Sequence, residues 1–466
     1  MPRPLKIDPE GNITIQINLM EFLKIFLILA FAFGTLLLPI EGITPASRFC
    51  LVLFILAAGL WITAVIPPFA TGILVMVLSI YVLGLPGGLL GLDSSGYTLF
   101  LNPISSPVLA LFFGGLVLAM GATKHGLDVR IAKAFLKPFG TKPANVLLAI
   151  ILITVFFSMF MSNTATTAMM IAIMTPILTQ FEGREFFKKA MVLAIPFAAN
   201  IGGVGTVIGS PPNAVAVSVL ATQGIHVSFF HWMVIGLPFA LIMSFILWVV
   251  FLKVFKPQKE EFNILFPQPL ALTWDLLVVV IAFALTLLLW LTEPLHKIPS
   301  AVVALIPVLM FSLFGIINAN DLKKLDWDVM ILIAGGMVLG VAMVTTGLSE
   351  ILVSYLELIK VPVLVMLCFV VLVTTVISNF MSNTSAANIL IPIVVVLADA
   401  DPFIGVLAVA FACSMAMSLP ISTPPNAIAF ATHAIETKEM FRNGTIISLI
   451  GVVMIWGLIT VLKYVF

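Results

Sequence analysis

The sequence predicts an all-α polytopic membrane protein with about eleven membrane-spanning helices and two re-entrant helical hairpins. Of its 466 residues, 61% are hydrophobic and 9% are charged, whereas about a quarter of the residues in a soluble domain carry charge. Apolar runs of about 20 residues recur along the chain, and a helix of that length crosses about 30 Å of hydrocarbon. The net charge of +1 gives no indication of a nucleic-acid partner.

Eleven apolar runs each have the length of one crossing. They are 21–40, 49–66, 69–89, 105–122, 187–208, 229–255, 271–291, 299–317, 328–346, 402–420 and 443–465. Two longer stretches, 143–180 and 362–398, are interrupted near the middle by Ser-Asn-Thr. Non-helical backbone at membrane depth is tolerated only where protein or water covers it. We therefore expect each long stretch to form two half-depth helices that meet at a polar tip.

The basic residues predict the orientation of these spans in the lipid bilayer. Six clusters hold 18 of the 22 Lys and Arg residues, at 3–24, 124–142, 184–189, 253–259, 323–324 and 438–442. All six are cytoplasmic if the N-terminus is inside, the C-terminus is outside and both hairpins return to their side of entry. Such a bias in short loops sets orientation, so the sequence predicts a multi-pass protein of the inner (plasma) membrane. Residues 1–46 would hold a cytosolic tail and the first span.

The remaining chain contains one series of motifs twice. Each half has Gly-Gly, then Ser-Asn-Thr, then Pro-Pro-Asn, at 114–115, 162–164 and 211–213 and again at 335–336, 382–384 and 424–426. This order predicts two repeats, 47–256 with the hairpin 143–180 and 268–466 with the hairpin 362–398. Because the hairpins would enter from opposite sides, the repeats are expected to be inverted. Inverted repeats with broken helices are a recurring plan of transporters.

The two Ser-Asn-Thr triplets each precede an apolar helical segment, Met161–Ile177 and Met381–Leu397. Ser, Asn and Thr are favoured N-cap residues. The first turn of a helix presents free N–H groups and about half a unit of positive charge, which binds anions without Lys or Arg. Two such tips near the middle of the membrane would suit a molecule with two anionic groups.

The Pro-Pro-Asn segments, 200–215 and 417–430, contain too much Gly and Pro for a continuous helix. Unwound backbone frees carbonyl oxygens, and these with hydroxyl and amide oxygens suit a hard cation such as Na⁺. All Asp, Glu and His residues fall in loops or near the ends of spans, so the carboxylate or His relay of a proton-coupled carrier is missing. The acidic metal motifs and nucleophiles of an intramembrane enzyme are missing too.

At these paired motifs the sequence resembles the divalent-anion/sodium symporter family of dicarboxylate, tricarboxylate and sulfate carriers, in particular bacterial dicarboxylate transporters of the INDY type. The resemblance covers nearly the whole chain. It implies a homodimer in which each protomer has a scaffold domain and an elevator-like transport domain that carries both hairpins.

The resemblance also implies roles for particular residues. One Na⁺ site would use Ser158, Ser162, Asn163 and Gly209. The second would use Ser378, the Met381 carbonyl, Asn383 and Ser422. The substrate carboxylates would be held by Asn163, Thr164, Ser210, Asn383, Thr384, Thr423 and Pro424. Relatives that exchange anions without Na⁺ place basic residues at the cation positions, whereas these positions are neutral here.

The sequence therefore predicts a secondary active transporter, not an enzyme, which couples Na⁺ to a dicarboxylate such as succinate, malate or fumarate, or to a tricarboxylate. Alternatives in the same family are a sodium-independent dicarboxylate exchanger and a sulfate or citrate cotransporter. A cation/H⁺ antiporter is disfavoured by the missing intramembrane Asp. The basic amphipathic segment 124–140 is either a helix at the membrane interface or an arm that joins the scaffold to the moving domain.

Overall fold

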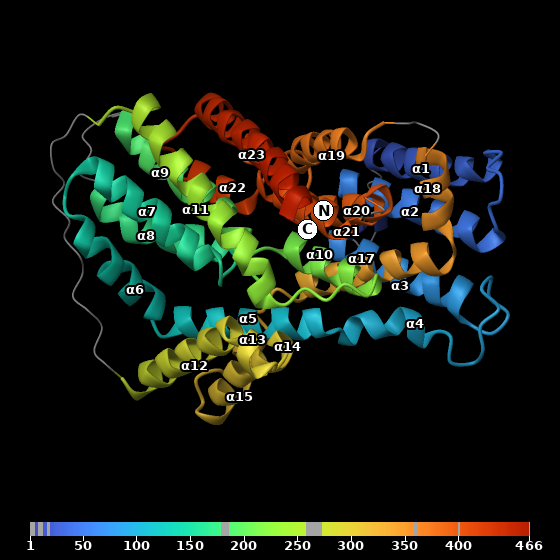
Figure 1. Ribbon diagram of the computed structural model, residues 1–466, viewed down its shortest axis with the longest axis horizontal. Helices are drawn as coiled ribbons and strands as arrows, with labels where there is room; N and C mark the ends of the chain where they lie inside the picture. The colour runs from blue at the N-terminus through green and yellow to red at the C-terminus, as the bar shows by residue number, and fades with distance from the viewer. Residues whose placement is uncertain are drawn as a thin grey trace.

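The architecture is known from a computed structural model, which describes residues 5–7, 13–15, 19–178, 186–257, 273–357, 361–398 and 401–465 (Figure 1). These residues are almost entirely helical. One short antiparallel pair, β1 (Leu5–Ile7) with β2 (Ile13–Ile15), lies in the predicted N-terminal tail. The predicted end of the first hairpin at 180 and the predicted start of the second repeat at 268 lie outside the described residues.

Seven helices of the described chain are long and apolar enough to cross a membrane. They are α1 (Leu19–Gly34) with its 3₁₀ extension η1 (Thr35–Leu37), α2 (Pro45–Thr63), α5 (Pro107–Lys124), α11 (Phe229–Val254), α12 (Trp274–Leu291), α17 (Trp327–Thr345) and α23 (Thr437–Val465). Every predicted span coincides with helix. Three of those spans are shorter or divided, however, because Gly and Pro interrupt them, so eleven full crossings remain a prediction.

The shorter apolar helices account for the other predicted spans. The run 69–89 forms α3 (Pro68–Ser79) and the π-helical turn η2 (Ile80–Gly84), and 299–317 is divided into α14 (Ser300–Val303) and α15 (Leu305–Leu313). The runs 187–208 and 402–420 end early, as α9 (Phe186–Gly203) and α21 (Pro402–Ser414). Short connecting helices are α4 (Thr98–Leu101), η3 (Asn102–Ser105), η4 (Lys137–Phe139), α13 (Glu293–His296) and α16 (Ala319–Leu322).

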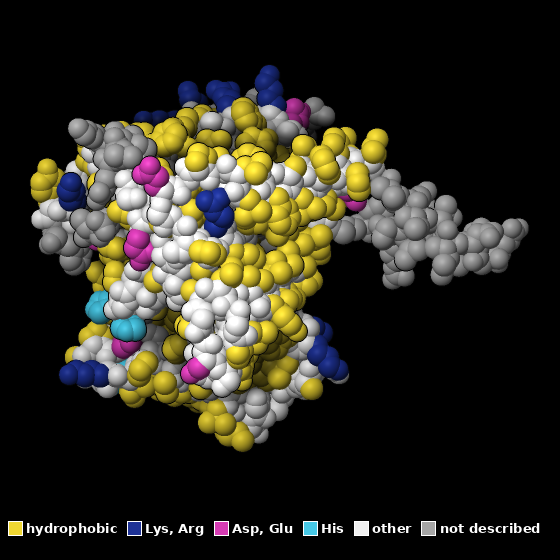
Figure 2. Space-filling model, turned by 90° about the vertical axis from the view of Figure 1, so that its right-hand side faces the viewer, with side chains coloured by type: hydrophobic (Ala, Val, Ile, Leu, Met, Phe, Trp, Pro, Cys, Tyr) yellow, Lys and Arg dark blue, Asp and Glu magenta, His cyan; other side chains and the backbone are white. Residues whose placement is uncertain are grey.

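Local sequence explains where the long helices begin. Thr44 Oγ1 accepts the Ser47 N–H at 3.1 Å before α2, and Ser106 Oγ accepts the Leu109 N–H at 3.3 Å before α5. Both helices then open with a proline, whose missing N–H costs nothing in the first turn. Many large apolar side chains remain outward, and Figure 2 shows hydrophobic side chains over much of one face with Lys and Arg in isolated groups.

The two stretches predicted to be hairpins are helix pairs interrupted at the triplets. α7 (Pro143–Ser158) and α8 (Asn163–Leu178) are joined by four residues and contact each other along their sides (Figure 1). α19 (Val363–Ser378) and α20 (Asn383–Leu397) repeat this arrangement. Both interruptions therefore occur where the sequence predicted them, although the depth of each pair in a membrane is a separate question.

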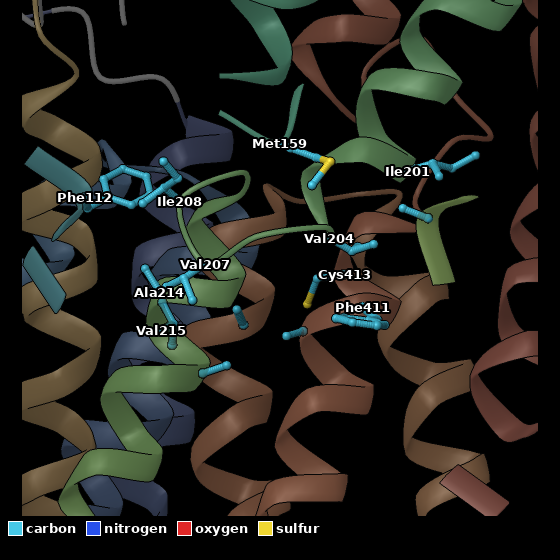
Figure 3. Close-up of a cluster of buried hydrophobic side chains, with 14 of the residues drawn as sticks. Phe112, Met159, Ile201, Val204, Val207, Ile208, Ala214, Val215, Phe411 and Cys413 are labelled. Carbon is cyan, nitrogen blue, oxygen red and sulfur yellow. The ribbon is translucent and has the colours of Figure 1, made fainter. Parts of the chain in front are cut away.

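The helices after the Pro-Pro pairs were not predicted. α10 (Pro211–Thr222) and α22 (Pro424–Phe430) begin directly at the prolines and follow the unwound ends of α9 and α21. Each packs against the triplet helix of the other half, so that α22 contacts α8 and α10 contacts α20. Below the unwound segment after α9, apolar side chains such as Val207, Ala214 and Phe411 form a buried cluster (Figure 3).

Two amphipathic helices precede the helix pairs. α6 (Leu127–Leu136) buries Leu127, Ala132 and Leu136 and contacts both α5 and α7. α18 (Leu348–Glu357) occupies the same place in the second half and contacts α17 and α20. Each helix therefore physically connects a long helix to one of the interrupted pairs.

Candidate functional site

Both Ser-Asn-Thr tips line one cavity of about 330 Å³. The first tip lies at the start of α8 and the second at the start of α20, and the starts of α10 and α22 complete the wall. All seven residues predicted to contact substrate line this cavity: Asn163, Thr164, Ser210, Asn383, Thr384, Thr423 and Pro424. Residues more than 200 positions apart in sequence are therefore brought to one site.

Each tip is closed by its own serine. Ser162 Oγ accepts the Ala165 N–H at 3.3 Å, and Ser382 Oγ accepts the Ser385 N–H at 3.1 Å. These bonds satisfy the third N–H of each helix, but the first two N–H groups, on the Asn and Thr of each triplet, have no partner within the helix. Both helix starts therefore retain donors, together with the positive end of the helix dipole, at the cavity wall.

The Pro-Pro starts of α10 and α22 contribute differently. Proline has no N–H, so the first two positions of these helices cannot donate hydrogen bonds. At the next position, the Asn213 N–H is bonded to the Ser210 carbonyl at 3.0 Å and the Asn426 N–H to Thr423 Oγ1 at 3.3 Å. Pro424 can therefore contact a ligand only through its surface, and backbone donors to an anion come from the two triplets.

Four oxygen atoms converge beside Asn163. Its Oδ1 lies 2.6 Å from Ser158 Oγ and 3.2 Å from the carbonyl oxygens of Ala199 and Gly209. Apart from the Ser158 hydroxyl, no hydrogen is available among these atoms, so they repel one another unless a cation sits between them or the amide turns its nitrogen inward. Three of the four residues, Ser158, Asn163 and Gly209, belong to the first predicted Na⁺ site. Ala199 is an addition that the sequence did not indicate.

Gly209 lies where backbone segments meet most closely. A Cβ placed on it would stand 2.7 Å from the Gly203 carbonyl oxygen, 3.0 Å from that of Ser158 and 3.2 Å from that of Met159. Only glycine allows these carbonyls to come so near. The end of α7 and the unwound end of α9 can therefore present oxygens to the same small volume.

The second predicted cation site is arranged less simply. Asn383 Oδ1 and Ser378 Oγ are both buried and make no hydrogen bond within the described chain, and Met381 is buried beside them in sequence. The Ser422 hydroxyl lies 2.9 Å from Asn379 Oδ1 and 3.1 Å from the Asn379 carbonyl oxygen. Asn379, which replaces the Met159 of the first half, is a site neighbour that sequence reasoning missed.

Three further asparagines fix the backbone of the site. Asn213 Nδ2 donates to the carbonyls of Gly203 and Thr206 at 2.7 and 2.8 Å, and Asn426 Nδ2 donates to that of Leu419 at 2.9 Å. These are the third residues of the two Pro-Pro-Asn motifs, so their repetition was the available signal.

Asn200 links the halves. Its Nδ2 lies 3.3 Å from Thr423 Oγ1 and 3.5 Å from Asn426 Oδ1. A single buried asparagine in an apolar helix gave no such indication.

The electrostatics of the cavity are unusual for an anion site. None of the described residues that line it is Lys, Arg or His, and its ionisable lining groups are Asp326 and Asp328, at the start of α17. Burial by surrounding protein, and then the charge of Asp328, raise the pKa of Asp326 above its ordinary value. The sequence placed Asp328 only at the end of a span, because its approach to the tips depends on tertiary packing.

A second cavity of about 630 Å³ adjoins the first. The two share Ser162, Thr164, Asp326 and Asp328, and the second extends to Lys124, Asp321 and Lys324. Lys124 Nζ lies 2.6 Å from Asp321 Oδ2, and this hydrogen bond holds the pKa of Asp321 below its usual value. Thr164 is exposed to this space whereas Thr384 is buried, so the two tips are not equally accessible.

Known proteins with similar sequences are membrane transporters. The family described as "Citrate transporter" (CitMHS) matches residues 51–397 and 287–465. A "Sodium-dependent dicarboxylate transporter SdcS" of Staphylococcus saprophyticus is 30% identical over 92% of this chain and 88% of its own length. A "Sodium-dependent high-affinity dicarboxylate transporter 3" of Caenorhabditis elegans is also 30% identical, over 73% of this chain and 71% of its own.

A solved transporter structure has the same general fold. The YdaH transporter of Alcanivorax borkumensis superposes with a TM-score of 0.59 at 12% sequence identity, over 84% of this chain and 98% of its own. These relatives and neighbours are transporters and not enzymes. The chain therefore belongs to the citrate-transporter family of membrane transporters, among the divalent-anion/sodium symporters that its paired motifs predicted.

Proposed function

We propose that this protein is a sodium-coupled symporter of C4-dicarboxylates such as succinate, malate or fumarate. The observation that carries the proposal is the single cavity between two helix starts that retain free N–H groups. Each start would bind one carboxylate of the substrate, with the Thr164 and Thr384 hydroxyls as further donors. The names of the relatives point to the same class of substrate.

Sodium coupling is supported by the charges of the site. A dianion beside Asp326 and Asp328, with no basic side chain among the described lining residues, would be strongly repelled. Cations bound next to the tips would offset that charge. The oxygens beside Asn163 form a suitable hard-ligand set, so Na⁺ binding would hold the Asn163 carbonyl oxygen inward and leave the helix start free for the anion.

The proposal extends to the architecture and movement of the protein. The repeats 47–256 and 268–466 would have inverted topology, with the pairs α7–α8 and α19–α20 as re-entrant hairpins. A scaffold domain would hold a homodimer together while a transport domain carries the site across the inner membrane as an elevator. The N-terminus would be cytoplasmic and the C-terminus outside. The contacts of α6 and α18 with both a long helix and a hairpin suit connecting arms.

Uptake of radiolabelled succinate by proteoliposomes tests the coupling. We expect accumulation only with an inward Na⁺ gradient, and uptake that persists when K⁺ or choline replaces Na⁺ would refute it. Counterflow that requires internal succinate and ignores Na⁺ would instead identify an exchanger. Competition by unlabelled malate, fumarate, citrate and sulfate would then assign the substrate, because the cavity volume alone admits several small dianions.

A further inference from the structure

A third cavity, of about 530 Å³, lies away from the transport site, where the last turn of α11 meets the first turns of α23 (Figure 1). Three basic side chains line it: Lys253 from α11, and Lys438 and Arg442 from α23. None of the three has an ion-pair partner within 4 Å among the described residues. The cavity therefore concentrates unpaired positive charge at one place.

The acidic side chains of this cavity do not cancel that charge. Glu439 is paired with Lys189 of α9, and its Oε2 also accepts the Glu436 N–H at 3.0 Å. Glu436 is then the one carboxylate left against the three basic groups, as far as the described lining residues show. The balance at neutral pH is positive, which favours an anionic ligand.

A buried acceptor lies among these charges. Asn443 lines the same cavity and is only 4% exposed. Its Nδ2 donates to the Glu439 carbonyl at 2.8 Å, but its Oδ1 is buried with no hydrogen-bond partner in the described chain. Burying such an oxygen unpaired costs free energy, so a ligand that brings a hydroxyl or N–H donor beside its anionic group would complete the site.

The surroundings indicate where that ligand comes from. α11 and α23 are both candidate membrane spans, and the cavity lies at their ends. Val254 and Phe441, at the same ends, are 38% and 52% exposed, which places apolar surface for a lipid chain directly beside the basic groups. Basic pockets between spans, on the side where Lys and Arg collect, bind anionic lipid headgroups.

We propose that this cavity binds the phosphate-bearing headgroup of an anionic phospholipid. Lys253, Lys438 and Arg442 would hold the phosphate, and Asn443 Oδ1 would accept a hydrogen bond from the polar end of the headgroup. Because the cavity joins α11 to α23, and Glu439 ties α23 to α9, the bound lipid would fasten three helices together. The site does not depend on which substrate the protein carries.

Thermal unfolding of the detergent-solubilised full chain, titrated with phosphatidylglycerol or phosphatidylcholine, tests the proposal. Phosphatidylglycerol should raise the unfolding temperature and phosphatidylcholine should not. In Lys438→Gln/Arg442→Gln the half-maximal phosphatidylglycerol concentration should rise about thirtyfold, since each basic group near an anionic lipid surface contributes about tenfold or somewhat less. The control Lys137→Gln/Lys142→Gln removes the same charge from exposed positions outside the cavity and should behave as the parent.

Further arms decide the remaining outcomes. The exchange Lys438→Arg/Arg442→Lys keeps the charge and should keep the response, and it replaces the glutamine pair if that variant does not fold. Equal stabilisation of the parent by both lipids would overturn the proposal, as would an equal loss in the control pair. Stabilisation by inorganic phosphate or succinate alone, at the expense of bound phosphatidylglycerol, would show a site for free anions and would also overturn it.

Discussion

Gly209→Ala is the sharpest test of the first cation site. The new methyl carbon would stand 2.7 Å from the Gly203 carbonyl oxygen and 3.0 Å from that of Ser158, where ordinary contact begins at 3.4 Å. Both obstacles are backbone atoms that no side-chain rotation can remove. The carbonyls must therefore move apart by several tenths of an ångström, in the volume where oxygens converge beside Asn163.

The size of the effect follows from the packing. Forcing one extra carbon into a filled interior costs about 1–3 kcal/mol. If that cost falls on the cation-bound state, it weakens apparent Na⁺ affinity roughly 5- to 150-fold. The substituted residue is far from the predicted substrate donors of α20, so the succinate KM at saturating Na⁺ should change much less than the Na⁺ dependence.

The assay is the initial rate of succinate uptake against external Na⁺ in proteoliposomes. Gly457→Ala is the matched control, because no heavy atom lies within 4 Å of the Cβ that it adds to α23. Size-exclusion chromatography and thermal unfolding show whether each variant is folded. A folded Gly209→Ala transporter with the parental Na⁺ dependence would refute the assignment of the oxygen cluster as a cation site.

Three further predictions concern the cavity. Asn163→Ala and Asn383→Ala should each abolish succinate uptake, because each removes a group proposed to serve both cation and anion; full activity in either variant contradicts the shared role. Thr164→Ala and Thr384→Ala should each raise the succinate KM about fivefold, the loss of about one hydrogen bond, with unchanged Na⁺ dependence as the check. Asp326→Asn should lower the succinate KM at neutral pH. Because burial and a neighbouring carboxylate raise the pKa of Asp326, the parent gains a proton there as pH falls and should approach the variant. Comparing the two at each pH cancels the titration of succinate itself, and a difference that ignores pH would refute this.

The sequence predicted the parts of the site that depend on local backbone chemistry. Ser-Asn-Thr and Pro-Pro-Asn state directly where a helix starts or cannot continue, and their repetition marked two halves of one site. It could not predict which surfaces those helix starts would meet. The packing of α22 on α8, the approach of Asp326 and the contact between Asn200 and Thr423 join segments far apart in the chain. No local pattern encodes them.

The bridge from Asn200 to Thr423 and Asn426 has a thermodynamic consequence. A group that touches both halves lets a ligand at one end bias the conformation of the other, and such coupling free energy is reciprocal. Ordering the backbone around Asn163 by the first bound ion would preset the wall that faces the second. The response of the transporter to its driving ion would then be sigmoidal, and the polar bridge buried between the halves would set its steepness.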